Sequence, residues 1–142
     1  MIESIIGREF PDKVIPLINN AKNSIKIVVF DWRWYPNDPS NPVQLFNQSI
    51  ARACARGVSV SCIANHTDII SSLQSVGASA KKLSVPNLVH VKMMLIDENI
   101  LIVGSHNYTQ HAFCQNYELS VLITGESDLK NYIDFFNNLW PQ

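Results

Sequence analysis

The sequence predicts an α/β protein, specifically a three-layer α/β/α sandwich with a mixed central β-sheet. Short strand-like segments alternate with segments whose apolar residues recur at helical spacing. The clearest strand candidate, 25–34, is apolar on both faces, with Ile25, Ile27 and Val29 on one and Val28 and Phe30 on the other. Such a strand needs helices on both sides of its sheet. No linker, repeat or low-complexity segment interrupts the alternation, so residues 1–142 are expected to form a single domain.

The elements are expected in a regular order. The first half is predicted to contain an edge strand over 2–7, a helix over 10–21, the strand 25–34, a loop over 35–42, a helix over 43–56, a strand over 58–64, a helix capped by Thr67 or Asp68 that runs to Val76, and a short strand over 78–83. The second half is predicted to contain a β-hairpin that starts at His90, a short helix over 108–114, a strand over 117–123 and a last helix from Ser127 or Asp128 to Leu139.

Local signals mark the helix boundaries. Pro11 suits a first helical turn, whereas Pro16 in the same segment predicts a kink or a later start. Gly57 and Gly77 follow the next two helices, where a glycine commonly ends a helix. In the helix over 43–56, the side chains expected to face inward are Leu45, Phe46, Ile50, Ala53 and Cys54.

The composition is that of a globular protein, with 46% hydrophobic and 16% charged residues. A formal net charge of −1 argues against a broad basic surface, so nucleic acid would have to be attracted by a local patch. The 3 cysteines are an odd number without CxxC spacing and are expected to be reduced thiols of an intracellular protein. The sequence has no signal-peptide pattern and no apolar run that approaches a membrane span, which predicts a soluble, cytoplasmic protein.

The predicted hairpin carries the most chemical information. A two-residue loop at 98–99 would pair Lys92 with Ser105 and His90 with Asn107. If the hairpin register differed by one residue, these pairs would shift by one position but the same side chains would still lie close together. The hairpin therefore gathers an imidazole, an ammonium, a hydroxyl and a carboxamide, a set that suits a phosphate group. If Ser105 or Asn107 lies near the N-cap of the following helix, free backbone N–H groups would favour the same anion.

The motif resembles that of a known family. His90-x-Lys92, four residues, Asp97, six residues and Gly104-Ser105-x-Asn107 resemble the HKD motif of the phospholipase D superfamily. The following Asn107-Tyr108-Thr109 and Asn116-x-Glu118 resemble its nuclease-like branch. The core match covers roughly a fifth of the chain, and the order of elements from Phe10 to Trp140 is compatible with one whole domain of that family.

The resemblance implies a two-step displacement at phosphorus. One histidine attacks to give a phosphohistidine, a second protonates the leaving oxygen, and water resolves the intermediate. His90 is expected to be the nucleophile, and Lys92 and Asn107 are expected to bind the phosphate oxygens. Ser105 would add a hydrogen bond or only shape the turn. Glu118 would accept a hydrogen bond from the far nitrogen of His90, or it would be a surface carboxylate.

A single His-x-Lys cannot supply two histidines. Short members of the family pair two copies, so the resemblance implies a symmetric homodimer whose active site contains His90 and Lys92 of both subunits. The alternative is that His106 or His111 serves as the second histidine, although each could instead be exposed or line the core. Asp97 belongs to the motif but lies at the hairpin loop, where a structural role with the turn or a neighbouring cation is expected.

Aromatic residues and an arginine follow the buried strand. In Asp31-Trp32-Arg33-Trp34-Tyr35, Trp32 could stack on a base and Arg33 could pair with a phosphate at the rim of the site. The aromatic residues could equally belong to the core or to a dimer interface.

The sequence predicts no metal or other cofactor, because its histidines, cysteines and carboxylates are not spaced as ligands. The expected function is that of a metal-independent phosphodiesterase, a non-specific endonuclease that cleaves DNA or RNA without a membrane partner. Two alternatives stay open. One is hydrolysis or transphosphatidylation of phospholipids, and the other is an inactive, dimeric nucleic-acid-binding module.

Overall fold

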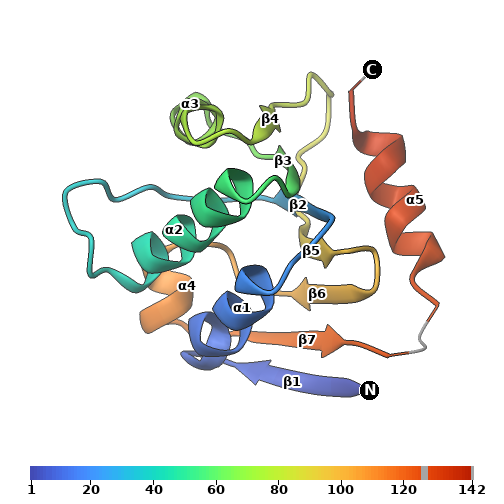
Figure 1. Ribbon diagram of the computed structural model, residues 1–142, viewed down its shortest axis with the longest axis horizontal. Helices are drawn as coiled ribbons and strands as arrows, with labels where there is room; N and C mark the ends of the chain where they lie inside the picture. The colour runs from blue at the N-terminus through green and yellow to red at the C-terminus, as the bar shows by residue number, and fades with distance from the viewer. Residues whose placement is uncertain (126–127, 142) are drawn as a thin grey trace.

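One mixed β-sheet runs through the computed structural model, which describes residues 1–125 and 128–141. Its strands are β1 (Ile2–Ile6), β2 (Ser24–Val29), β3 (Ser59–Ile63), β4 (Ser79–Lys81), β5 (Lys92–Ile96), β6 (Ile100–Gly104) and β7 (Leu119–Ile123). Side by side they follow the order β1-β7-β6-β5-β2-β3-β4 (Figure 1). Strands β2, β3 and β4 are parallel and the other neighbouring pairs are antiparallel, so the predicted mixed sheet is confirmed.

Helices cover both faces of this sheet. In the described part of the chain they are α1 (Glu9–Asn19), α2 (Pro42–Ala55), α3 (Thr67–Ser75), α4 (Gln110–Cys114) and α5 (Lys130–Leu139). Helices α1 to α4 share one core cluster with Ile25 and Ile27, whereas α5 packs Phe136 with Val28 on the opposite face. Strand β2 is thus covered on both sides, and the three-layer α/β/α arrangement is confirmed (Figure 1).

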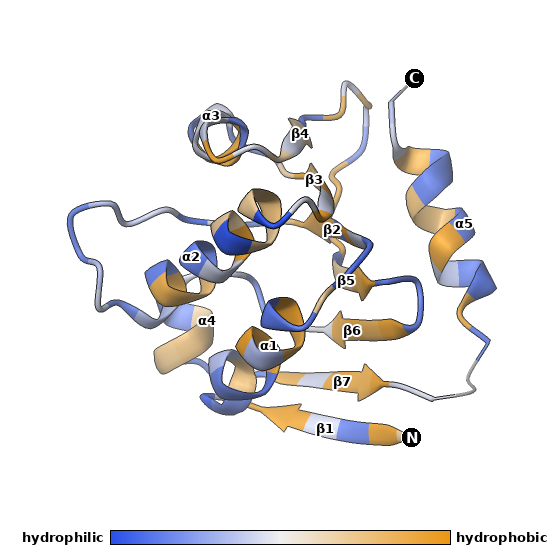
Figure 2. Cartoon of the chain, viewed as in Figure 1, coloured by the Kyte–Doolittle hydropathy of each residue, from blue (hydrophilic) through white to orange (hydrophobic). Residues whose placement is uncertain are grey.

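Hydropathy follows these layers. Strands β5, β6 and β7 are mostly hydrophobic, and α2 and α5 each carry hydrophobic and hydrophilic residues in alternation (Figure 2). On α2, Phe46, Ile50 and Ala53 are buried as expected, whereas Leu45 is 49% exposed. The inward position expected for Leu45 is wrong, because one residue along a helix turns the side chain by about 100° and takes it off the buried face.

Two helices begin differently from the prediction. Helix α1 begins at Glu9 and continues past Pro16, so the late start that Pro16 suggested is wrong. Helix α3 begins at Thr67, with His66 as its N-cap and no side-chain cap hydrogen bond. Neither Thr67 nor Asp68 is therefore the cap residue.

The last helix begins at Lys130, whose backbone N–H donates to Oδ1 of Asp128 at 2.9 Å. Asp128 thus interacts with the helix start as expected, and Ser127, the other predicted start, lies outside the described residues. Across the described ranges, every helix is too short or too polar to cross a membrane.

The hairpin of β5 and β6 has a longer loop than predicted. Ile96 pairs with Ile100, so the loop has three residues instead of two. Asp97 and Glu98 both lie in the left-handed region, with φ values of 54° and 56°. The hydrophobic pattern contains no signal for two consecutive left-handed residues, so it does not determine the length of this loop.

This extra residue shifts the pairing within the motif. Met93 pairs with Val103, which places Lys92 level with Gly104 instead of Ser105. Both predicted pairs in the motif are therefore wrong by one residue, although the motif residues still gather at one end of the sheet.

Asp97 anchors the hairpin loop to the chain that enters β2. Its carboxylate accepts hydrogen bonds from the backbone N–H groups of Lys22, Asn23 and Ser24, at 3.0, 2.7 and 3.0 Å. Partial burial raises the pKa of Asp97, but the three N–H donors outweigh it, and the pKa lies below its ordinary value. This geometry agrees with the expected structural role and explains why an aspartate suits this position of the motif.

Replacing Asp97 by alanine is expected to lower the free energy of unfolding by about 3 kcal/mol at neutral pH, because charge-assisted hydrogen bonds are lost and alanine tolerates positive φ poorly. The pKa of Asp97 is lower in the folded protein than its ordinary value of 3.8, so the ionised carboxylate stabilises the fold fully above that ordinary value. This stabilisation is lost as the pH falls through the folded-state pKa. Asp97→Asn is the matched control. Thermal unfolding should show wild type losing its advantage over Asp97→Asn in acid; a constant difference would refute this role of the charge.

Candidate active site

Four segments meet at one edge of the sheet. Because β5 is antiparallel to β2 and β6, and β7 is antiparallel to β6, the ends of β2 and β6 lie beside the starts of β5 and β7. This edge collects the predicted site residues, namely Trp32 and Arg33 after β2, His90 and Lys92 at the start of β5, Ser105 and Asn107 after β6, and Glu118 before β7. Residues far apart in the sequence thus share one location.

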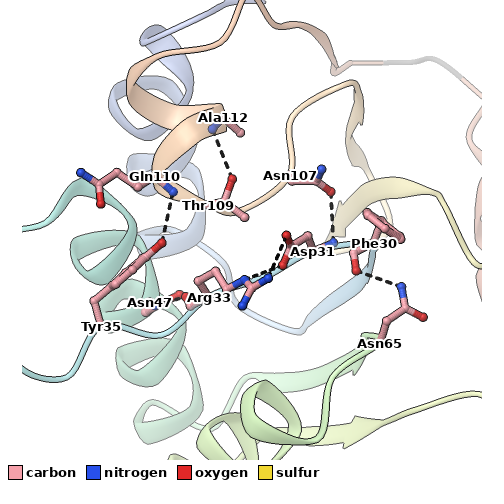
Figure 3. A network of polar contacts seen from close by, with 10 residues as sticks. All are labelled: Phe30, Asp31, Arg33, Tyr35, Asn47, Asn65, Asn107, Thr109, Gln110 and Ala112. Atoms are coloured by element: carbon pink, nitrogen blue, oxygen red, sulfur yellow. Dashed lines mark hydrogen bonds and ion pairs between the residues drawn. The ribbon is translucent and has the colours of Figure 1, made fainter.

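Asn107 is fixed by the segment that follows β2. This segment pairs with the chain after β6 through Trp32 and Tyr108. The N–H of Arg33 donates to the carbonyl of Tyr108, and the N–H of Tyr108 donates to the carbonyl of Asp31, both at 3.0 Å. Next to them, the N–H of Asp31 donates to Oδ1 of Asn107 at 3.1 Å (Figure 3). Because its carbonyl oxygen is occupied, Asn107 has its amide N–H groups left to offer an anion.

His90 and Lys92 contact each other beside the ring of Phe30. The Lys92 Nζ lies 2.9 Å from Nδ1 and 3.2 Å from Nε2 of His90. The Phe30 ring centroid lies 4.7 Å from that of His90 and 5.5 Å from the Lys92 Nζ. An ammonium can only donate, so the imidazole nitrogen in contact with it accepts the hydrogen bond through its lone pair. The motif spacing does not predict this role of Phe30; its one signal is an aromatic residue directly after a buried strand.

The environment of Lys92 strengthens its attraction for an anion. Burial lowers the pKa of Lys92 and the carboxylate of Glu118 partly raises it again, which leaves the pKa below its ordinary value. A partly desolvated ammonium is shielded less by water than an exposed one, so its interaction with a phosphate is stronger.

Glu118 is bonded to Ser105 and Asn116 instead of His90. The Ser105 Oγ donates to Oε1 of Glu118 at 2.5 Å, and the Asn116 Nδ2 donates to Oε2 at 3.0 Å. The Ser105 Oγ also accepts the N–H of Leu119 at 3.0 Å. The expected bond between His90 and Glu118 is not formed, because β7 neighbours β6 whereas His90 precedes β5, one strand further away. The Ser105 hydroxyl thus orients this carboxylate, and its hydrogen bond to a phosphate stays a prediction.

His106 belongs to the core. It is 1% exposed, and its Nδ1 lies 2.7 Å from the Ser120 Oγ and its Nε2 lies 2.8 Å from the Gly7 carbonyl oxygen. Burial lowers the pKa of His106, which favours the neutral ring. Since both ring nitrogens are bonded inside the fold, the alternative that made His106 a second catalytic histidine is wrong. His111 is exposed on α4 near Asn107.

The helix after the motif is capped by Thr109, whose Oγ1 accepts the N–H of Ala112 at 3.2 Å (Figure 3). Helix α4 starts only at Gln110, two residues later than predicted. Neither Ser105 nor Asn107 is therefore the N-cap, and the anion-binding role expected of this helix terminus has no support.

Trp32 lies in the core, so the expected stacking of this residue on a base is wrong. It is 1% exposed, and its indole N–H donates to Oδ1 of Asn47 on α2 at 2.7 Å. This buried partner is what allows a tryptophan to be covered completely. Arg33 is exposed, as its predicted role requires, and its Nε donates to Oδ1 of Asp31 at 2.8 Å (Figure 3).

A polar groove of about 450 Å³ adjoins the site; it is lined by Asp31, Arg33, Tyr35, Asn107, Thr109, His111 and Asn116. Amides, a guanidinium, a phenol and an imidazole are groups that bind phosphates and sugar or base edges. In the described ranges, His, Cys, Asp and Glu side chains do not gather in threes that could hold a metal ion.

Sequence comparisons found a family and a relative to which the chain is similar. Residues 14–140 match the family model described as the PLD-like domain of cardiolipin synthase. The chain is 31% identical over 74 residues to human mitochondrial cardiolipin hydrolase, a stretch that covers 51% of this chain and 29% of that relative.

Solved structures share the fold. NucT from Helicobacter pylori superposes with a TM-score of 0.81 at 17% identity, covering 98% of this chain and 94% of that one. The phospholipase D family member Nuc from Salmonella typhimurium superposes with a TM-score of 0.80 at 20% identity, covering 99% and 95%. These similarities show that nearly the whole chain shares the fold of both proteins.

Proposed function

Because the chain belongs to the phospholipase D-like family, we propose that it is a metal-independent phosphodiesterase that cleaves nucleic acid at the sheet edge described above. The observation that carries this proposal is the contact of 2.9 Å between the exposed His90 imidazole and the Lys92 ammonium. It combines a nucleophile with a cation at the same end of the sheet as Asn107. Covalent catalysis on a phosphodiester needs these groups together.

The proposed reaction has two steps. A neutral nitrogen of His90 attacks phosphorus, and the N–P bond forms while the P–O bond to the leaving group breaks. A second acid gives its proton to the leaving oxygen. Water then attacks phosphorus as the N–P bond breaks, and it gives its proton to the second group, which had become a base in the first step. This regenerates both His90 and the acid. Lys92 and the Nδ2 of Asn107 stabilise the charge on the non-bridging oxygens in both steps.

The second acid is proposed to be His90 of another copy of the chain in a symmetric homodimer. Two observations support this. His106 is engaged in the core, which removes one candidate within the chain. In addition, Ile6, Tyr117 and Leu119 are exposed next to Ser105 and Glu118, an apolar surface at the rim of the site that a second copy could cover. His111 is the candidate for the acid if the protein acts as a monomer.

Nucleic acid is the proposed substrate because the adjoining groove is polar. Arg33 and the amides of Asn107 and Asn116 suit phosphate and base edges, and Tyr35 presents a partly exposed ring. Among the described lining residues only His111 lies in a helix, the short α4, and the others lie in loops, so little sequence preference is expected. The intact set of His90, Lys92 and Asn107 favours an enzyme over an inactive binding module.

Phospholipid is the second candidate substrate. The segment that leads to His90 exposes Val85 by 49% and Leu88 by 68%, and such side chains could enter a lipid surface. The family description and the human relative both carry cardiolipin in their names.

The test is a panel of single- and double-stranded DNA, RNA and cardiolipin vesicles, all incubated with the protein in EDTA. Cleavage of nucleic acid in chelator, by a species with the native mass of a dimer, is the expected result. Cleavage of cardiolipin without cleavage of nucleic acid would contradict the proposed substrate and would favour phospholipid. Complete loss of cleavage in EDTA would contradict the metal-independent mechanism, and full activity of a strictly monomeric species would contradict the shared site.

A further inference from the structure

Asn65 lies directly after β3 and holds two other segments together. Its Nδ2 donates to the carbonyl oxygen of Phe30 at 2.9 Å and to the carbonyl oxygen of Val89 at 3.0 Å. Figure 3 shows the first of these bonds beside the Asp31 and Asn107 contact. One acceptor is thus the residue whose ring touches His90, and the other is the residue that precedes His90 in the chain.

The sheet places Asn65 there. Strands β2 and β3 are parallel, with Val28 paired to Ile63, so two residues further on Asn65 lies level with Phe30. Both residues are past the last ladder pair of their strands. A side-chain amide at this position can therefore satisfy a backbone carbonyl that the sheet leaves free.

The segment before β5 depends on this bond. Residues 82–91 form neither helix nor strand and are mostly exposed. Leu83 and Val89 pack against the core cluster under α5, but apolar packing sets no direction for the following backbone. For the part of the chain that the structure describes, the bond from Asn65 is the one hydrogen bond that ties residues 83–89 to the sheet.

We propose that Asn65 is a positioning residue for the His90 nucleophile. Asn65 bonds the backbone carbonyls of Phe30 and Val89 and so holds these two segments together. This positions the Phe30 ring, which contacts the His90 ring, and the backbone that leads into His90. An asparagine suits this role because one amide nitrogen carries two N–H donors. Aspartate has the same shape but would set a carboxylate against two carbonyl oxygens. The inference rests on the proposed function for its kinetic part only.

The variant Asn65→Asp tests the role without a change in side-chain volume, and Asn87→Asp is the matched control. Asn87 is exposed in the same segment, so the control introduces the same charge without breaking the bond to Val89. Asn65→Asp is expected to lower kcat by about 100-fold with little change in KM, because misplacing a reacting group slows the chemical step more than binding. Asn87→Asp should keep the wild-type kcat. Equal values of kcat for both variants would overturn the proposal.

A second measurement does not depend on the substrate. The His90 imidazole nitrogens can be followed by NMR in the folded protein, with the signals of buried His106 as an internal measure of intact structure. Asn65→Asp should shift the His90 signals, whereas Asn87→Asp should leave them in place. Unchanged His90 signals in Asn65→Asp would overturn the positioning role even if the wild type cleaved no phosphodiester. Absence of cleavage with shifted signals would instead contradict the proposed function alone.

Discussion

His90→Ala is expected to lower kcat/KM for phosphodiester cleavage by roughly 10,000-fold, since removing a nucleophile leaves only the residual contribution of the other site residues. Little effect on stability is expected. His90 is exposed and precedes β5, so its side chain fills no core space. The measurement is cleavage kinetics combined with thermal unfolding of the same samples.

His111→Ala is the matched control for His90→Ala, because it removes an exposed imidazole from the neighbouring groove. A dimeric site with two copies of His90 predicts a modest effect of this substitution. If His111→Ala were as damaging as His90→Ala in a monomeric protein, His111 would be the second acid. Cleavage that survives His90→Ala unchanged would contradict the mechanism altogether.

Gly104→Ala is expected to destabilise the fold by about 3 kcal/mol or more, through steric overlap in a close-packed sheet. An added Cβ would overlap the Cα and Oγ of Ser120 and the carbonyl oxygen of Leu119, and two of these three atoms belong to the backbone. Strands β6 and β7 would have to separate, which would disturb the bond between Ser105 and Glu118. The glycine of the motif is thus explained by strand packing.

Gly7→Ala provides the comparison for Gly104→Ala. A Cβ on Gly7 meets nothing within 4 Å, although the residue has a φ of 53°. Gly7→Ala should therefore lower the free energy of unfolding only through backbone strain, by about 1–2 kcal/mol. Chemical denaturation of both variants measures the difference. A Gly104→Ala protein as stable as Gly7→Ala would mean that β6 and β7 can relax apart without loss.

Local pattern was sufficient to predict the layers of the fold. The apolar residues on both faces of β2 required helices on both sides of the sheet. Ile27 belongs to the core cluster that includes residues of α1 to α4, and Val28 belongs to the one that includes Phe136 of α5. The spacing of the motif likewise predicted that His90, Lys92 and Asn107 lie at one edge of the sheet, where the structure places them. These predictions depend on period and spacing, which the sequence contains directly.

The remaining features depend on contacts between distant segments. The left-handed Asp97 accepts hydrogen bonds from the chain that enters β2, and the left-handed Glu98 accepts one from Lys26 on β2. Their conformation could therefore not be predicted from the loop residues alone. Glu118 binds Ser105 because β7 lies beside β6, and Trp32 is covered because Asn47 on α2 accepts its indole N–H. The bonds of Asn65 likewise require knowledge of which strand lies next to β2.

The central claim is that His90 forms a bond to phosphorus during turnover. The most direct measurement is to mix the protein with an end-labelled oligonucleotide, stop the reaction in alkaline denaturant, and identify the labelled peptide by mass spectrometry. We predict a nucleotide linked through phosphorus to His90 in the wild type and in His111→Ala, and none in His90→Ala. An adduct on His111, or turnover with no adduct on His90, would contradict it.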